Sequence, residues 1–431
     1  MSTQSIFWFR RDLRFIDNHG LFQALTQSKI VNPIFIFDEN ITKKLDTNDH
    51  RLAFIKSQLN NLNKELIKFN SSLNIYFGSP VKIFEKIISE NSIDAVFWNK
   101  DYEPYAIKRD KKIEKLLKSN NIKSFSFKDQ VIFEEREVVK NDGTPYVVYT
   151  PYSKKWMEKL SNKDVKHFKS EAFLSKTKKL KKLNTNIKTF DINESNIKPP
   201  KVNFNNDVIK NYERDRNTPE INGTSKLGLH LRFGTKSIRS LVKKSNLSQN
   251  KTFLKELIWR EFFMQILWHF PETTTQCFKS KYEKIKWRNN MDEFNAWCEG
   301  KTGYPIVDAG MRELNKTGFM HNRVRMITAS FLCKHLLIDW RIGEKYFASK
   351  LFDYEQSSNI GNWQWVAGCG VDAAPYFRIF NPYEQQKKFD KEKVYVKKWI
   401  SEYDTTKYPQ EIVNHKLARE RCLKAYKEAV S

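Results

Sequence analysis

The sequence has no long apolar run and no export signal. No stretch of its 431 residues approaches the roughly 18 unbroken apolar residues that a membrane span needs. The first residues, MSTQSIFWFRRDLR, lack a basic stretch followed by a long apolar one. Hydrophobic residues still make up 40% of the chain, which is enough for sizeable cores. We therefore expect a soluble, cytoplasmic protein of two or three domains, monomeric and without an obligate protein partner.

Cysteine is scarce and scattered. No C-x-x-C pair occurs, which argues against a zinc or iron–sulfur site built from adjacent ligands. A chain inside the cell also rarely carries disulfides. No metal site is predicted, and ordinary thiols are expected at Cys277, Cys298, Cys333, Cys369 and Cys422.

Acidic residues are few relative to basic ones. The chain has 50 Asp and Glu against 76 Lys and Arg, a formal net charge of +26. Such a charge attracts a polyanion, and phosphate neutralisation supplies most non-specific affinity for nucleic acid. Lys, Asn and Ile are abundant together, so part of the excess is attributed to an AT-rich genome. Nucleic acid remains the leading predicted partner.

The first 130 residues alternate between β-rich and helical segments, for example the helical segments Arg51–Phe69 and Tyr105–Ser119. This pattern predicts an α/β domain over residues 1–130, with a parallel five-stranded sheet covered on both faces. The domain is Rossmann-like, but G-x-G-x-x-G is absent and no dinucleotide is assigned to it. The predicted strands are Ser5–Phe9, Pro33–Asp38, Asn74–Gly78, Ala95–Asn99 and Ser124–Lys128.

Residues 131–201 break this pattern and are predicted to connect two domains. The lysine-rich run 175–184 is interpreted as a plain linker in preference to a nucleic-acid arm. Residues 202–431 are predicted to form an all-helical domain, since apolar residues recur there at helical spacing. The helices expected in it include Phe253–Trp268, Gly310–Thr317, Asn322–Leu337 and Gly343–Phe352.

Aromatic and charged residues gather in the helical half. Seven of the 11 tryptophans fall within Trp259–Trp365. Core packing is the better interpretation for any single tryptophan, but the clustering favours stacking or electron relay. Glu256 precedes Trp259 by three residues and shares its helical face. Arg325 and Asp353 are predicted to form an ion pair, which a purely structural role would explain equally well.

Small and hydroxyl residues precede a helical run at 223–228, the segment GTSKLG. Free backbone N–H groups at a helix start form a seat for phosphate, although any helix N-cap looks similar. Composition and spacing alone do not name the chemistry.

Five long motifs go further, and with them the sequence resembles the photolyase and cryptochrome family, and within it the class I cyclobutane-dimer photolyases. The likeness covers nearly the whole chain. The motifs stand at Phe7–Arg14, Glu299–Leu314, Met320–Met326, Asn362–Trp365 and Asp372–Pro382.

The resemblance implies FAD bound in the helical domain, active as FADH−. Tyr212 and Thr224, Ser225, Lys226, Leu227 and Gly228 match the segment that holds its phosphates. Arg325, Asp353 and Glu355 match the polar groups around the isoalloxazine, and Asn359 matches the residue that faces N5. The family often has Asp where Glu355 stands, and Ser where Gly228 stands. The second difference removes a hydroxyl from the phosphate seat.

The resemblance also implies light-dependent repair of cyclobutane pyrimidine dimers in DNA, by an electron from photoexcited FADH− to a flipped-out dimer. Residues matching the dimer pocket are Glu256, Asn322, Arg323 and Met326, with Trp259 and Trp365 as its aromatic walls. Positions matching DNA contacts are Arg216, Arg260, Arg323 and Gln385, together with Glu256, Trp259 and Asn322; Arg378 is a further candidate for a phosphate contact. The tryptophans matching the relay that re-reduces the flavin are Trp363, Trp340 and Trp287.

Three alternatives stay open. The (6-4) photolyases share a His-His pair at the pocket helix. This chain has Met320-His321-Asn322 there, with one histidine, so the cyclobutane type is favoured. A signalling cryptochrome would bind FAD without repair, and a light-independent DNA-binding module would be colourless. For a second, antenna chromophore, the folate contacts of relatives are missing after Tyr102-Glu103. This leaves a deazaflavin, a second flavin or an empty site.

Overall fold

The computed structural model describes residues 2–180, 192 and 195–431, and the chain divides into two compact units. The predicted connector is shared between them, and residues 228–247, expected in the helical domain, belong to the first unit. Part of the lysine-rich run lies outside the described residues. The first unit comprises Met1–Glu137, Glu158–Asn196 and Gly228–Leu247. The second comprises Val138–Met157, Ile197–Leu227 and Ser248–Ser431.

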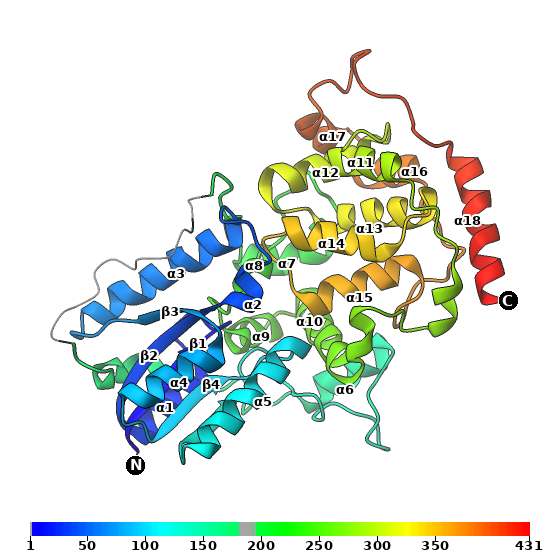
Figure 1. Cartoon of the computed structure of the whole chain (residues 1–431). Helices are drawn as coiled ribbons and strands as arrows, with labels where there is room; N and C mark the ends of the chain where they lie inside the picture. The colour runs from blue at the N-terminus through cyan, green and yellow to red at the C-terminus, as the bar shows by residue number, and fades with distance from the viewer. Residues whose placement is uncertain (1, 181–191, 193–194) are drawn as a thin grey trace. The chain divides into compact units, whose positions relative to one another are not determined.

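The first unit contains the predicted five-stranded sheet (Figure 1). Every neighbouring pair of strands is parallel, in the order β3-β2-β1-β4-β5. The prediction of a parallel α/β sheet is therefore confirmed, although β1 and β2 begin earlier than expected. The strands are β1 (Ser2–Phe9), β2 (Ser28–Asp38), β3 (Asn74–Gly78), β4 (Ala95–Asn99) and β5 (Lys123–Phe127).

Helices cover both faces of this sheet, as neighbouring residues of β1 show. Trp8 meets Phe84 of α4 (Pro80–Glu90), with ring centroids 5.2 Å apart. Phe7 points to the other face, where a Cβ at Gly20 of α1 (His19–Gln27) would lie 3.1 Å from its ring. The unit's remaining helices are α2 (Glu39–Thr42), α3 (His50–Ile67), α5 (Pro104–Ser119), the 3₁₀ helix η1 (Ser170–Lys176), α8 (Gly228–Arg232) and α9 (Ile238–Asn246).

A buried ion network explains why α9 belongs with the sheet. The Arg239 guanidinium lies 3.1 Å from Asp17 and 2.8 Å from Asp129. All three residues are buried, so each charge requires the others. Sequence periodicity carried no sign of this long-range pairing.

Helices are the regular elements of the second unit within the residues that the structure describes, apart from an isolated bridge between Val139 and Pro145. The four predicted helices are present, but residues predicted as one helix, Asn322–Leu337, divide into α13 and a short π-helix. The helices of this unit are α6 (Tyr149–Lys159, extending beyond it), α7 (Asn206–Asp215), α10 (Thr252–His269), η2 (Pro271–Thr274), η3 (Ser280–Lys284), α11 (Met291–Glu299), α12 (Pro305–Thr317), α13 (Asn322–Ser330), η4 (the π-helix, Phe331–His335), α14 (Trp340–Lys350), α15 (Gln356–Ala367), α16 (Pro382–Phe389), α17 (Val394–Trp399) and α18 (His415–Val430).

Helix α15 lies at the centre of this unit, against α10, α13 and α14 (Figure 1). Gly361 permits the close approach to α10, since a Cβ at this position would come within 2.2 Å of the Phe263 ring. Helix α10 has apolar residues on all sides and is largely buried, as expected of a helix surrounded by others.

A contact between buried His335 of the π-helix and partly exposed His415 of α18 predicts acid sensitivity. His335 Nε2 lies 2.8 Å from His415 Nδ1, and burial, then His415 and Arg421, lower the pKa of His335 to about 3. His335 therefore takes up a proton near pH 6.5 in the unfolded chain but only near pH 3 in the folded chain. Stability should be fully present above that pH and fall as the pH drops toward 3.

We expect His335→Gln to lose less stability than the parent between pH 7 and pH 5, by about 2 kcal/mol. Denaturant unfolding at the two pH values measures this difference. Equal losses in variant and parent would mean that His335 is protonated in the folded chain.

Candidate functional site

A cavity of about 360 Å³ lies within the second unit, between α10, α13, α14 and α15. It brings together most of the residues that the sequence suggested for the pocket. Of the predicted residues, those lining it are Arg216, Glu256, Trp259, Arg260, Asn322, Arg325, Met326, Asp353, Glu355, Asn359, Trp363 and Trp365.

Two ion pairs form part of the cavity wall. Arg325 Nη2 lies 2.9 Å from Asp353, so the predicted pair is present, and Arg325 Nε donates to the Met320 carbonyl at 2.8 Å. Arg260 Nη2 lies 3.2 Å from Glu355, and only 11% of the Arg260 side chain is exposed. Arg260, predicted as a DNA contact, therefore has its guanidinium against a carboxylate in the cavity wall.

Asn359 is held in place by the half-buried side chain of Glu344. Its Nδ2 donates to Glu344 Oε1 at 2.9 Å and to the Glu344 carbonyl at 3.2 Å. Burial raises the pKa of Glu344, which favours its protonated form. Because the amide nitrogen faces Glu344, the amide oxygen of Asn359 is oriented by the same contact.

Glu256 is a carboxylic acid that α10 contributes to the cavity. Burial raises the pKa of Glu256, and a contact with the Arg216 guanidinium opposes that rise. About a third of each side chain remains exposed, at 33% for Arg216 and 32% for Glu256. Burial favours the protonated form of Glu256, which can donate a hydrogen bond, whereas Arg216 favours the carboxylate, which can only accept one.

Arg323 lies beside the cavity, not in its lining. Its Nη1 is 3.6 Å from Met326 Sδ and its Nη2 donates to Asn217 at 2.6 Å, while its guanidinium stands 4.4 Å above the Phe389 ring of α16. Burial, then Arg216 and Arg378, lower the pKa of Arg323.

This second-unit cluster of Arg216, Arg323 and Arg378 concentrates positive charge that an anion would neutralise. Gln385, another predicted DNA contact, lies in α16 with Phe389 and is partly exposed.

The predicted phosphate segment and the cavity share one neighbour, the Phe319 ring. Lys226 Nζ lies 5.9 Å from the centre of the Phe319 ring, and the Arg325 guanidinium lies 5.7 Å from it. Lys226 has φ +54°, so its backbone turns in the left-handed region, and Leu227 is buried. Thr224 and Ser225 precede it, and Gly228 begins α8, which has only five residues. Tyr212 lies against Phe253, with ring centroids 5.0 Å apart.

Two of the three relay candidates are buried and the third is partly exposed. Trp363 lines the cavity and is buried, Trp340 is buried, and Trp287 is partly exposed. Gly343 lies on α14 one turn after Trp340, and a Cβ there would come within 2.3 Å of the Trp363 ring. Trp340 on α14 and Trp363 on α15 therefore belong to one packed core.

Sequence reasoning missed several cavity residues. Tyr354 lies between the predicted Asp353 and Glu355, which was a usable signal. The apolar residues could not be told from core, because their spacing fits helix packing equally well. Those missed are Phe263, Ala329, Phe347, Leu351, Tyr354, Ser358, Asn362 and Val366.

The donor set of the cavity fits the edge and faces of a flavin. A flat heterocycle with hydrogen-bond donors and acceptors on its edge requires both types of partner inside apolar walls. Arg325 supplies donors, Asp353 and Glu355 supply acceptors, and tryptophan and phenylalanine rings supply the walls.

Among the described residues, no group of three metal-ligating side chains occurs, and no helix is long and apolar enough to cross a membrane.

Comparison with known proteins agrees with this site. Residues 253–428 match the FAD binding domain of DNA photolyase, and residues 5–171 match the DNA photolyase family. Deoxyribodipyrimidine photo-lyase of Agrobacterium fabrum is 36% identical over 98% of this chain and 97% of its own length. The Escherichia coli protein of that name is 35% identical, covering 99% of each chain.

Solved structures lead to the same family. A class III photolyase from Agrobacterium tumefaciens matches with a TM-score of 0.85 and 33% identity, covering 100% of this chain and 98% of its own. An archaeal photolyase from Sulfolobus tokodaii, solved with two FAD molecules, matches with a TM-score of 0.82 and 32% identity, over 99% of this chain and 100% of its own. The motif-based recognition is therefore confirmed, together with the FAD-binding domain. This chain belongs to the DNA photolyase family.

Proposed function

We propose that this protein repairs cyclobutane pyrimidine dimers in DNA in a light-dependent reaction. The observation that carries the proposal is one cavity in which Glu256, Asn322 and Met326 stand with two half-buried tryptophans and the Arg325–Asp353 pair. Reduced FAD held in this cavity would supply, under light, the electron that splits the cyclobutane ring, and would take it back once the two pyrimidines have separated.

The chain's own residues hold and polarise the dimer. A dimer weakens base stacking, so its extrusion costs only a few kcal/mol. Trp259 and Trp365 recover part of this, since stacking on an aromatic side chain contributes about 1–3 kcal/mol per base. Glu256, with its pKa raised by burial, donates a hydrogen bond to a pyrimidine carbonyl as negative charge develops there.

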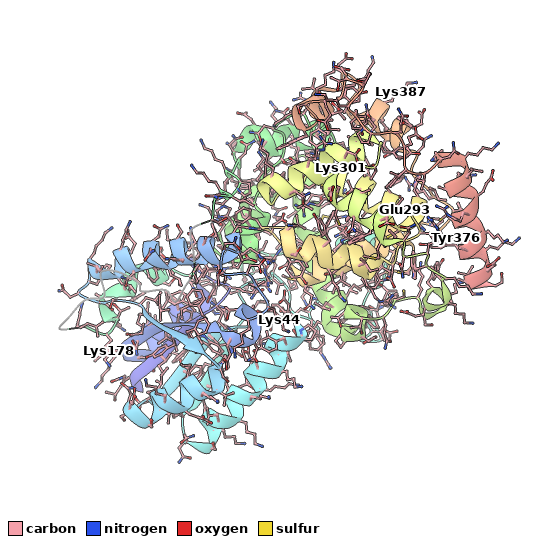
Figure 2. All side chains as sticks on the ribbon, turned by 45° about the horizontal axis from the view of Figure 1, so that its top comes forward. Lys44, Lys178, Glu293, Lys301, Tyr376 and Lys387 are labelled. Atoms are coloured by element: carbon pink, nitrogen blue, oxygen red, sulfur yellow. The ribbon has the colours of Figure 1, made fainter. Side chains whose placement is uncertain are left out.

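The surface charge suits a DNA partner. Lysines such as Lys44 and Lys387 are exposed (Figure 2). Together with the net charge of +26 they favour phosphate neutralisation along the backbone. The arginine cluster Arg216, Arg323 and Arg378 would contact the phosphates nearest the everted dimer.

Arg323→Ala should weaken DNA binding and reduce the slope of log affinity against log salt by about 1. The reason is the loss of one guanidinium that neutralises a phosphate. Affinity measured by fluorescence anisotropy at several salt concentrations gives the slope. Lys301→Ala, at an exposed lysine paired with Glu299, is the control and should change neither the slope nor the preference for damaged DNA. An unaltered slope in Arg323→Ala would mean that Arg323 touches no phosphate.

A repair assay tests the proposal directly. Flavin-loaded protein is mixed with an oligonucleotide that carries one cyclobutane thymine dimer, and product is followed by chromatography under blue light and in the dark. Repair in the light alone is expected. Bound FAD without repair would contradict the proposal in favour of a photoreceptor, and repair of a (6-4) lesion instead would reassign the substrate.

A further inference from the structure

Helix α6 lies against the cavity helix α10, although its residues fell within the predicted connector. Tyr149, its first residue, stacks on Trp259 with ring centroids 3.5 Å apart and an interplanar angle of 6°. The Tyr149 hydroxyl donates to the Lys255 carbonyl at 2.8 Å, and its backbone N–H donates to Asp372 at 3.2 Å. Tyr149 is thus fixed at both its ring and its backbone.

The next turns of α6 hold the same face of α10. Tyr152 meets the Phe262 ring at a centroid distance of 5.3 Å, and Trp156 Nε1 donates to Glu261 at 2.6 Å. Both residues are buried. Positions 149, 152 and 156 follow helical spacing, so one face of α6 contacts α10 over two turns.

Trp259 has one ring face against Tyr149 and lines the cavity, whereas Tyr149 does not line it. Phe263, one turn further along α10, also lines the cavity and lies 5.5 Å from Trp259 at 28°. A parallel stack at 3.5 Å determines the tilt of the Trp259 ring. The orientation of the Trp259 ring inside the cavity is therefore set by Tyr149, which lies outside the cavity.

We propose that Tyr149 is a positioning residue for recognition of the everted pyrimidine dimer, acting through Trp259. The inference rests on the proposed function and extends it by a residue outside the cavity. It contributes to preference for the lesion over undamaged DNA, because the uncharged indole of Trp259 faces the cavity and offers a stacking surface, not a charge for a backbone phosphate. The chemical step, once the dimer is seated, should not depend on it.

The test compares Tyr149→Met, which removes the ring but keeps an unbranched apolar side chain, with Tyr149→Phe, which keeps the ring. Affinities for dimer-containing and undamaged oligonucleotides are measured on flavin-loaded protein, with single-turnover repair at saturating enzyme. Tyr149→Met should bind dimer DNA about three- to tenfold more weakly, the value of one aromatic pair. Binding of undamaged DNA, flavin content and the repair yield per bound dimer should stay at the parent's values.

Tyr149→Phe should restore dimer affinity to within about twofold of the parent, since stacking and not the hydroxyl carries the effect. Tyr146→Leu is the matched control: Tyr146 belongs to the same segment and meets Tyr152, with centroids 6.4 Å apart. It should behave as the parent.

An unchanged lesion preference in Tyr149→Met, equal weakening on both DNAs, loss of flavin, or failure of Tyr149→Phe to restore binding would each overturn the inference. If the parent itself does not prefer dimer DNA, the proposed function fails instead.

Discussion

Trp287→Phe is expected to abolish light-driven reduction of bound oxidised FAD, while chemically reduced protein repairs dimers at nearly the parent's rate. The reason is that phenylalanine keeps the packing but not the readily oxidised indole. Trp287 is the only one of the three relay candidates that is partly exposed, so it is where an external reductant can deliver an electron. Its ring lies 6.0 Å from Tyr426, which fixes it against the core.

The measurement is flavin absorbance under blue light with an added reductant. Trp268→Phe is the matched control, because Trp268 is also partly exposed but lies at the end of α10 beside His269. It should photoreduce as the parent does. Equal photoreduction in Trp287→Phe would remove Trp287 from the relay.

Arg325→Met should lose most of its bound FAD on purification. The guanidinium makes charged hydrogen bonds in the cavity wall, each contributing about 1.5–3 kcal/mol. The loss of one such bond to the flavin corresponds to roughly 10- to 100-fold weaker FAD binding. The ratio of flavin to protein absorbance and titration of FAD into apoprotein measure the effect.

Two controls separate FAD binding from general damage. Arg312→Met removes a guanidinium from a comparable pair, 2.7 Å from Glu402, with 20% and 26% of the two side chains exposed, and should retain FAD. In Arg325→Met the Asp353 carboxylate is left without its arginine, and adding Asp353→Asn removes that charge. The double variant should still be purified without bound FAD. Recovery of FAD in that double variant would show that Arg325 acts only by neutralising Asp353.

The sequence alone was sufficient for the two-part architecture and for the parallel sheet. Strands β3 and β4 match their predicted bounds, because alternation of short β-rich runs with helices is a local property. The motifs identified the family, since residues such as Arg325 and Asp353 are recognised by order and spacing. The Arg325–Asp353 pair was predicted because buried charges require partners.

Only the tertiary structure decided which segments serve the site and which residues close around it. Tyr149 lay in a supposed connector, and nothing local indicates that its ring stacks on Trp259, 110 positions away in the numbering of the chain. Only the structure shows that Glu355 faces the guanidinium of Arg260 and that α9 joins the sheet through Arg239. Each of these depends on contacts between distant parts of the chain, which side-chain spacing along a single element does not encode.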